Sequence, residues 1–231
     1  MRLDKYISHC SALSRKDSRK AIKAGNVAVN AVATTNPGVH ISSDDVVALN
    51  DQILALPQYR YFMINKPQNV VSASRDSANR CVTDLLAEQP PGLQLAGRLD
   101  KDATGLVLLS DDGQWIHQII APNKHCWKTY LVTTDIELPE SAAKEFERGI
   151  KLTGEGKSTL PAMVEKQQPL NYCVRVREGR YHQVKRMFAH FNVQVLSLHR
   201  TQIGAIELDD TLSPGAFRLL TNAEIASVAA Q

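Results

Sequence analysis

The chain has 231 residues, of which 43% are hydrophobic and 22% charged, and its formal net charge is +3. This length and composition predict one or two domains with apolar cores, and they exclude a disordered chain, a collagen-like repeat and a small disulfide scaffold. No apolar run reaches the roughly 18 residues that cross a bilayer, and the N-terminus lacks the order of an export signal, so we expect a cytoplasmic protein without membrane contact.

The cysteines of the chain lie far apart and form no C-x-x-C pair: Cys10, Cys81, Cys126 and Cys173. This spacing is typical of reduced thiols rather than of a zinc site or a disulfide framework. The sequence also lacks the glycine-rich nucleotide-binding motifs and the H-E-x-x-H metal motif. We therefore expect neither a metal nor another cofactor.

The first 23 residues carry a local excess of positive charge. Against Asp4 and Asp17 stand seven basic residues: Arg2, Lys5, Arg15, Lys16, Arg19, Lys20 and Lys23. A stripe of one sign is typical of a surface that binds a phosphate backbone, so we predict that these seven residues contact nucleic acid. A solvated helix face without a ligand is the alternative.

The first 57 residues predict a small unit of two short helices followed by a strand hairpin. Ser14 and Asp17 have the spacing of a capping box at the start of the second helix, and Gly25 ends that helix. Strands are predicted at 27–29, 46–49 and 53–56. A unit of this size is too small for a large cavity.

Residues 58–231 predict a second domain in which strands and helices mix. The predicted strands are 60–65, 70–73, 105–110, 130–133, 172–176 and 193–199, and the predicted helices are 113–120, 139–148, 181–191 and 221–229. They do not alternate as regular βαβ units. We therefore predict an α+β fold with a mixed, mainly antiparallel sheet rather than a doubly wound one.

A dense polar cluster, residues 97–105, directly precedes a buried apolar run. If the chain were extended there, four polar side chains would share one face: Arg98, Asp100, Asp102 and Thr104. Such a face could carry catalysis, or it could be a charged turn with a surface ion pair. Two carboxylates at about 5–5.5 Å would also suit a retaining glycosidase.

A second polar cluster, residues 175–188, is rich in positive charge. Its basic residues are Arg175, Arg177, Arg180, Lys185 and Arg186. A helix beginning at Tyr181 would place Tyr181, Val184, Phe188 and Phe191 on an apolar stripe and aim Lys185 at a site on another face. The nearby aromatic Tyr130 would suit a base-stacking pocket, with a core position as the alternative.

Together these segments resemble the pseudouridine synthases that act on 16S ribosomal RNA, and the resemblance covers nearly the whole chain. Residues 2–5 and 25–29 resemble an S4-type RNA-binding domain. The other segments resemble that family's catalytic loop, tyrosine strand and basic helix, which match residues 97–105, 128–132 and 179–188. Each segment alone is a weak signal, but all of them in the same order are a strong one.

The resemblance implies an enzyme that detaches uracil from one ribose of 16S rRNA and rejoins it through C5, in a central cleft and without a cofactor. Asp100 matches the family's catalytic aspartate, Tyr130 the tyrosine that stacks on the target base, and Lys185 the basic partner of the aspartate. Two positions depart from the family pattern, because Ala103 replaces a common threonine and Asn69 a common glycine.

The resemblance also sets the remaining expectations. Arg98 and His182 are expected to contact the substrate, and Arg180 and Arg186 to contact RNA. The expected partner is 16S rRNA within a small-subunit assembly intermediate, bound by a monomer. Two other functions stay open: a pseudouridine synthase acting on 23S rRNA or tRNA, and a non-catalytic S4-type RNA-binding assembly factor.

Overall fold

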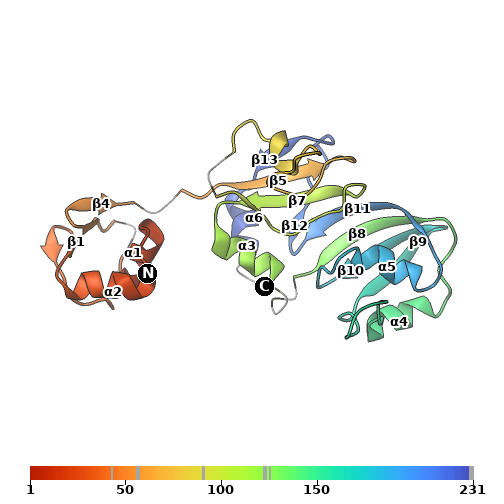
Figure 1. Cartoon of the computed structure of the whole chain (residues 1–231), viewed down its shortest axis with the longest axis horizontal. Helices are drawn as coiled ribbons and strands as arrows, with labels where there is room; N and C mark the ends of the chain where they lie inside the picture. The colour runs from red at the N-terminus through yellow and green to blue at the C-terminus, as the bar shows by residue number, and fades with distance from the viewer. Residues whose placement is uncertain (43, 56–57, 90–91, 122–123, 125, 229–231) are drawn as a thin grey trace. The chain divides into compact units, whose positions relative to one another are not determined.

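The computed structural model describes residues 1–42, 44–55, 58–89, 92–121, 124 and 126–228. Leu56, Pro57 and Ala229, which belong to predicted segments, lie outside the described residues. The chain divides into two compact units, Met1–Gln58 and Tyr59–Gln231, and many of their elements are labelled in Figure 1. No helix in the described ranges is long and apolar enough to cross a membrane.

The first unit contains two helices and a four-stranded antiparallel sheet of order β2-β1-β3-β4. Its elements are α1 (Leu3–Cys10), α2 (Arg15–Lys23), β1 (Val27–Val29), β2 (Val32–Ala33), β3 (Val47–Leu49) and β4 (Gln52–Leu54). The Ser14 hydroxyl accepts a 3.1 Å hydrogen bond from the Asp17 N–H at the start of α2, and the predicted stop, Gly25, has a φ of 81°. The small core includes Leu3, Ile7 and Ile22.

The second unit is built on a nine-stranded sheet (Figure 1). In spatial order its main strands are β13 (Phe217–Leu219), β5 (Tyr61–Lys66), β7 (Thr104–Ser110), β11 (Val195–Ile203), β8 (Lys128–Thr134), β10 (Asn171–Val176) and β9 (Met163–Gln168). The short strands β6 (Gln94–Leu95) and β12 (Ile206–Glu207) pair with β7 and β11. Among the described pairs only β7–β11 is parallel, so the predicted α+β fold with a mainly antiparallel sheet is confirmed.

Helices cover both faces of this sheet. Leu106 and Leu108 of β7 pack with α3 (Gly113–Ile120) and α6 (Asn222–Ser227). Val107 and Leu109 point the other way, toward α4 (Ala142–Arg148), α5 (Gln183–Ala189) and the 3₁₀ helix η1 (Val82–Leu85). Because neighbouring residues of a strand face opposite sides, the apolar run of β7 is buried on both, and each such side chain contributes about 1.5–3 kcal/mol.

Gly105 allows the parallel strands β7 and β11 to approach closely. Its φ is 101°, and a Cβ at this position would collide with the carbonyl oxygen of Arg200. Only glycine adopts this backbone conformation and contact without strain. The close approach holds the polar segment that precedes β7 beside Arg200.

The prediction of a strand at 70–73 is wrong. Val71 forms only an isolated bridge, and the Ser72 hydroxyl donates to the carbonyl of Leu99 at 2.8 Å and accepts from its N–H at 3.0 Å. A side chain that bonds to backbone groups replaces a strand ladder here. This segment is thereby tied to the polar loop at 97–103.

The helix predicted from Tyr181 begins two residues later, at Gln183. His182 has a left-handed backbone with a φ of 48°, which a helix cannot contain. Val184 and Phe188 face the core as predicted, but Tyr181 is 77% exposed rather than part of the apolar stripe. The misplaced helix start matters because both Tyr181 and His182 lie at the site described below.

The other boundaries shift by a few residues. The strand predicted at 193–199 is β11, and the helix predicted at 139–148 is α4, which ends before Gly149 as predicted. The sequence pattern does not predict β9, because this edge strand exposes most of its residues and carries no apolar alternation.

Candidate functional site

A cavity of about 740 Å³ opens in the second unit. Most of its lining comes from the polar loop at 97–101, β8, the segment 176–184 and β11. Its lining includes Asp100, Tyr130 and His182. Segments far apart in the sequence thus bring the predicted site residues to one hollow, which is the cleft that the family resemblance implies.

The loop that carries Asp100 is a turn. The Ala103 N–H donates to the Asp100 carbonyl at 3.1 Å, so the extended arrangement that would line up Asp100 and Asp102 on one face is wrong. The Asn69 N–H donates to the Lys101 carbonyl at 2.9 Å and supports the turn from outside. Asn69 has a φ of 65°, a conformation that glycine favours and asparagine tolerates, which explains its departure from the family pattern.

Two basic side chains face the Asp100 carboxylate, which is 26% exposed. His182 Nε2 lies 3.3 Å from Asp100 Oδ1, and Lys185 Nζ lies 3.7 Å from Oδ2. The short hydrogen bonds of Lys185 go instead to Asp102, at 2.6 and 2.7 Å. This bond from Lys185 lowers the pKa of Asp102 below its ordinary value. Asp100 therefore keeps oxygen lone pairs that can meet a ligand.

Lys66 lies beneath the same loop and is wholly buried. Its ammonium donates to the carbonyls of Pro67 and Lys101 at 2.9 and 3.3 Å. Burial lowers the pKa of Lys66 to about 8, although the negative charges of Asp102 and Asp100 act in the opposite direction. No local pattern marks Lys66 as a buried cation, so sequence reasoning missed it.

Arg200 connects the loop, the tyrosine and the sheet. It is 1% exposed and donates to the carbonyls of Leu106 and Arg98, at 2.8 and 3.2 Å. Its Nη1 also lies 3.4 Å from the Tyr130 hydroxyl. Nothing in the sequence pattern distinguishes this arginine from an exposed strand residue, so sequence reasoning missed it.

The predicted contact residues Tyr130 and Arg98 both line the cavity. Tyr130 is 8% exposed and belongs to the core of the sheet as well, so the two interpretations of this residue are compatible. The Arg98 side chain is exposed, and the described residues give its guanidinium no hydrogen bond or ion pair. It is therefore available to an anionic ligand.

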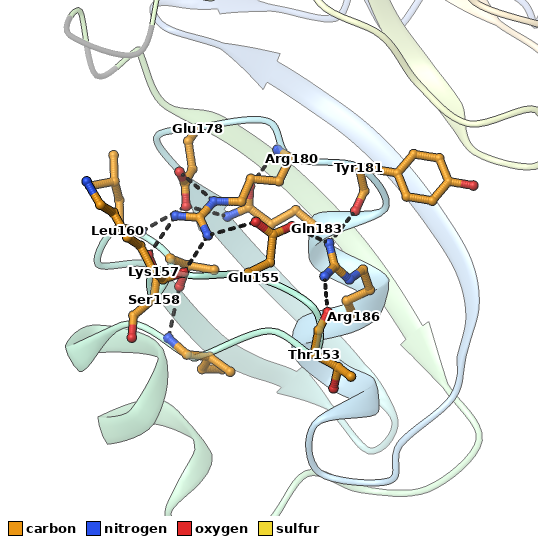
Figure 2. Close-up of polar contacts among 12 residues, drawn as sticks. Thr153, Glu155, Lys157, Ser158, Leu160, Glu178, Arg180, Tyr181, Gln183 and Arg186 are labelled. Carbon is orange, nitrogen blue, oxygen red and sulfur yellow. Dashed lines mark hydrogen bonds and ion pairs between the residues drawn. The ribbon is translucent and has the colours of Figure 1, made fainter.

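Arg180 and Arg186 are not arranged as free phosphate-binding side chains (Figure 2). Arg180 donates to the carbonyls of Lys157 and Ser158 and to Glu178, at 2.8, 2.6 and 3.1 Å. Arg186 donates to Glu155 and to two backbone carbonyls. The protein itself uses these donors, so both arginines hold the turn before α5, and their contact with RNA stays a prediction.

The basic cluster of the first unit is built around a buried carboxylate. Asp4 is wholly buried and pairs with Arg2, Arg15 and Arg19 at 3.2, 3.3 and 2.7 Å. Burial alone would raise the pKa of Asp4, but the hydrogen bonds of the three arginines outweigh it and hold the pKa well below its usual range. These arginines, each about half exposed, therefore share one negative charge.

The remaining predicted RNA contacts of the first unit are exposed lysines: Lys5, Lys16, Lys20 and Lys23. Lys20 makes an exposed ion pair with Asp17 at 3.3 Å. The basic residues of this unit are thus four exposed lysines and three arginines that share the charge of Asp4.

The described residues contain no group of three or more histidine, cysteine, aspartate or glutamate side chains that could hold a metal ion. The four cysteines are unpaired, as their spacing predicted.

Comparisons with known proteins match both units. The sequence model of a family described as RNA pseudouridylate synthase matches residues 60–190, and that of the S4 domain matches residues 1–47. The protein named ribosomal small subunit pseudouridine synthase A from Salmonella typhimurium is 43% identical over 231 residues, covering 99% of this chain and 100% of its own. The proteins of that name from Escherichia coli K12 and Vibrio cholerae are 43% and 40% identical, each covering 99% of this chain.

A solved structure titled as a crystal structure of pseudouridylate synthase is similar as well. It is 40% identical in sequence, its TM-score is 0.71, and the match covers 99% of both chains. The likeness therefore extends over the S4-like unit and the unit with the cavity.

Proposed function

The chain belongs to the RNA pseudouridylate synthase family, and on that premise we propose that it converts one uridine of 16S ribosomal RNA to pseudouridine, with Asp100 as the catalytic carboxylate. The relatives that bear a small-subunit name support this choice of RNA. The observation that carries the proposal is the environment of Asp100. Its carboxylate lies at the cavity, and the protein leaves its oxygens with lone pairs that can contact a ligand.

The reaction is an isomerisation. The bond from C1′ to N1 of uracil breaks, the base turns, and a bond from C1′ to C5 forms, while C5 loses a proton and N1 gains one. Asp100 can begin it as a nucleophile at C1′ or C6, or as a base that removes a ribose proton. All three roles need an oxygen lone pair that faces the nucleoside.

The uridine must leave its stack to reach Asp100, which costs a few kcal/mol. In the proposed complex the Tyr130 ring stacks on the everted base and returns about 1–3 kcal/mol of that cost. His182 and Lys185 hold the carboxylate in place from either oxygen, and the exposed guanidinium of Arg98 binds a phosphate next to the target.

The proposal is tested by tritium release from RNA labelled at C5 of uridine, because this proton is lost when the new bond forms. Small-subunit rRNA, large-subunit rRNA and tRNA transcripts are offered separately to the full chain without added cofactor. We expect release from the small-subunit transcript alone. Release from another transcript would reassign the substrate, and binding without any release would overturn the proposed reaction.

A further inference from the structure

Tyr181 presents its ring at the cavity without a partner from the core. It is 77% exposed, and it lines the cavity next to Asp100 and His182. An aromatic ring so exposed is unusual, because the apolar body of tyrosine normally finds cover in a folded chain. We therefore ask whether the exposed ring contacts a ligand of the cavity.

The ring is not free to take any direction. It lies parallel to the imidazole of His182, with the ring centroids 3.9 Å apart and the planes inclined by 16°. His182 in turn contacts the Asp100 carboxylate at 3.3 Å. One face of Tyr181 is thus covered by a ring that touches the proposed catalytic group, and the other face is open.

The turn beneath Tyr181 is held by a network of hydrogen bonds (Figure 2). Arg186 donates to the Tyr181 carbonyl at 3.1 Å, and the Arg180 N–H donates to the side chain of Gln183 at 2.9 Å. Figure 2 shows the Tyr181 ring directed away from this network. The left-handed backbone of His182 is a conformation that few residues other than glycine adopt, and these hydrogen bonds hold the turn that contains it. The turn is therefore built to hold this pair of rings at the cavity.

We propose that Tyr181 is a binding site for a second nucleobase, the base of a nucleotide that adjoins the everted uridine. When the uridine leaves its stack, its neighbour loses a stacking partner. The open face of Tyr181 replaces that partner and continues the stack of His182 and Tyr181 into the RNA. The inference rests on the proposed function, because it takes RNA as the ligand.

A double-mutant cycle tests this contact: one member removes the Tyr181 ring, the other removes a base of the RNA, and the binding affinity is measured. The RNA probes are a small-subunit rRNA hairpin with the target uridine and two copies of it that lack the base before or after the target. Each is titrated with full-length Asp100→Asn protein, which prevents turnover, alone and combined with Tyr181→Ala. We expect Tyr181→Ala to weaken binding of the intact hairpin about tenfold, and by less than about twofold where the contacted base is missing.

Tyr181→Phe is the matched control, since it keeps the ring and removes only the hydroxyl, and we expect its affinity to stay within about twofold of the parent. A loss by Tyr181→Ala that is the same on all three RNAs would overturn the proposal. So would a fall in turnover without a change in affinity, because Tyr181 would then only support His182.

The proposed reaction can fail independently of this contact. The wild-type protein could release no tritium although the effect of Tyr181→Ala on binding still depended on one flanking base. That result would overturn the proposed reaction but not the proposed base contact.

Discussion

Two aspartates of this protein lie among basic side chains, and their surroundings differ in one respect. Asp4 is wholly buried and hydrogen-bonded by three arginines, the shortest at 2.7 Å. Asp100 is 26% exposed, its two basic neighbours lie at 3.3 and 3.7 Å, and a cavity adjoins it. The protein saturates the first carboxylate and leaves the second with unused lone pairs. This unused capacity is what supports Asp100 as the proposed catalytic carboxylate and Asp4 as the centre of a structural ion cluster.

The arginines repeat the same contrast. Arg180 and Arg186 give their donors to neighbouring carbonyls and carboxylates, whereas the described residues give the exposed guanidinium of Arg98 no such partner. Positive charge in the sequence therefore does not by itself identify an RNA contact, because partners within the fold can use it.

The largest predicted effect is the loss of activity on substitution of Asp100, which distinguishes it from Asp4. Asp100→Asn should lower tritium release at least about a thousandfold, because the amide is neither a nucleophile nor a base. Its unfolding free energy should change by less than about 1 kcal/mol, since the groups that face Asp100 are partly exposed. Appreciable remaining isomerisation, measured beside the wild type, would remove Asp100 from the reaction.

The second prediction concerns Lys66, a buried lysine beneath the loop that carries Asp100. Its pKa is about 8 in the folded chain against an ordinary value of 10.5, so the unfolded chain binds more protons between these pH values. Wild-type stability should therefore rise with pH across this window, by about 3 kcal/mol in total. Lys66→Met cannot titrate and should lack this rise.

The measurement for Lys66 is denaturant unfolding of both proteins from pH 7 to 10.5. The unfolding free energy of the wild type minus that of Lys66→Met should increase with pH, because the two proteins share all other titrating groups. If the two unfolding free energies changed in parallel with pH, the pKa of Lys66 would not be lowered in the folded chain, and this prediction would be wrong.

The third prediction removes the saturated carboxylate. Asp4→Asn should destabilise the first unit by about 2–3 kcal/mol, because charge-assisted hydrogen bonds to a buried group are lost while the half-exposed arginines regain water. Native-state hydrogen exchange of α1 and α2 reports this loss locally. Asp51→Asn, at an exposed position of the same unit, is the control and should change stability by less than about 0.5 kcal/mol. Equal protection in both variants would show that the cluster does not stabilise the unit.

The stability that Asp4 supplies should also depend on pH in a definite direction. Because its pKa is depressed in the folded chain, this stability is complete above the ordinary value of 3.8 and is lost as the pH falls below it.

The smallest effect is predicted for the second carboxylate of the loop. Asp102 is 70% exposed, so its pair with Lys185 is worth under about 1 kcal/mol, and Asp102→Asn should change turnover less than about tenfold. Tritium release at several pH values checks this. A loss as large as that of Asp100→Asn would make Asp102 the reacting group.

Regular elements with a strong local pattern could be predicted from the sequence. The helix predicted at 113–120 is α3, and the apolar run at 105–110 lies in β7. The edge strand β9 could not, since its side chains mostly face solvent and carry no alternation. The turn at Tyr181 and His182 could not either. Arg186 donates to the Tyr181 carbonyl and the Arg180 N–H donates to the Gln183 side chain, and these bonds hold the turn against a local preference for helix.

The sequence by itself determined the family, through motifs in a fixed order, and with it the α+β class and the S4-like unit. It also singled out Asp100, Tyr130, His182 and Lys185, which line or adjoin one cavity. Only the tertiary structure decided which charges pair. Lys185 bonds to Asp102 more closely than to Asp100, and buried Arg200 holds the loop. The physical reason is that an ion pair depends on distances between segments far apart in the chain, which no local pattern contains.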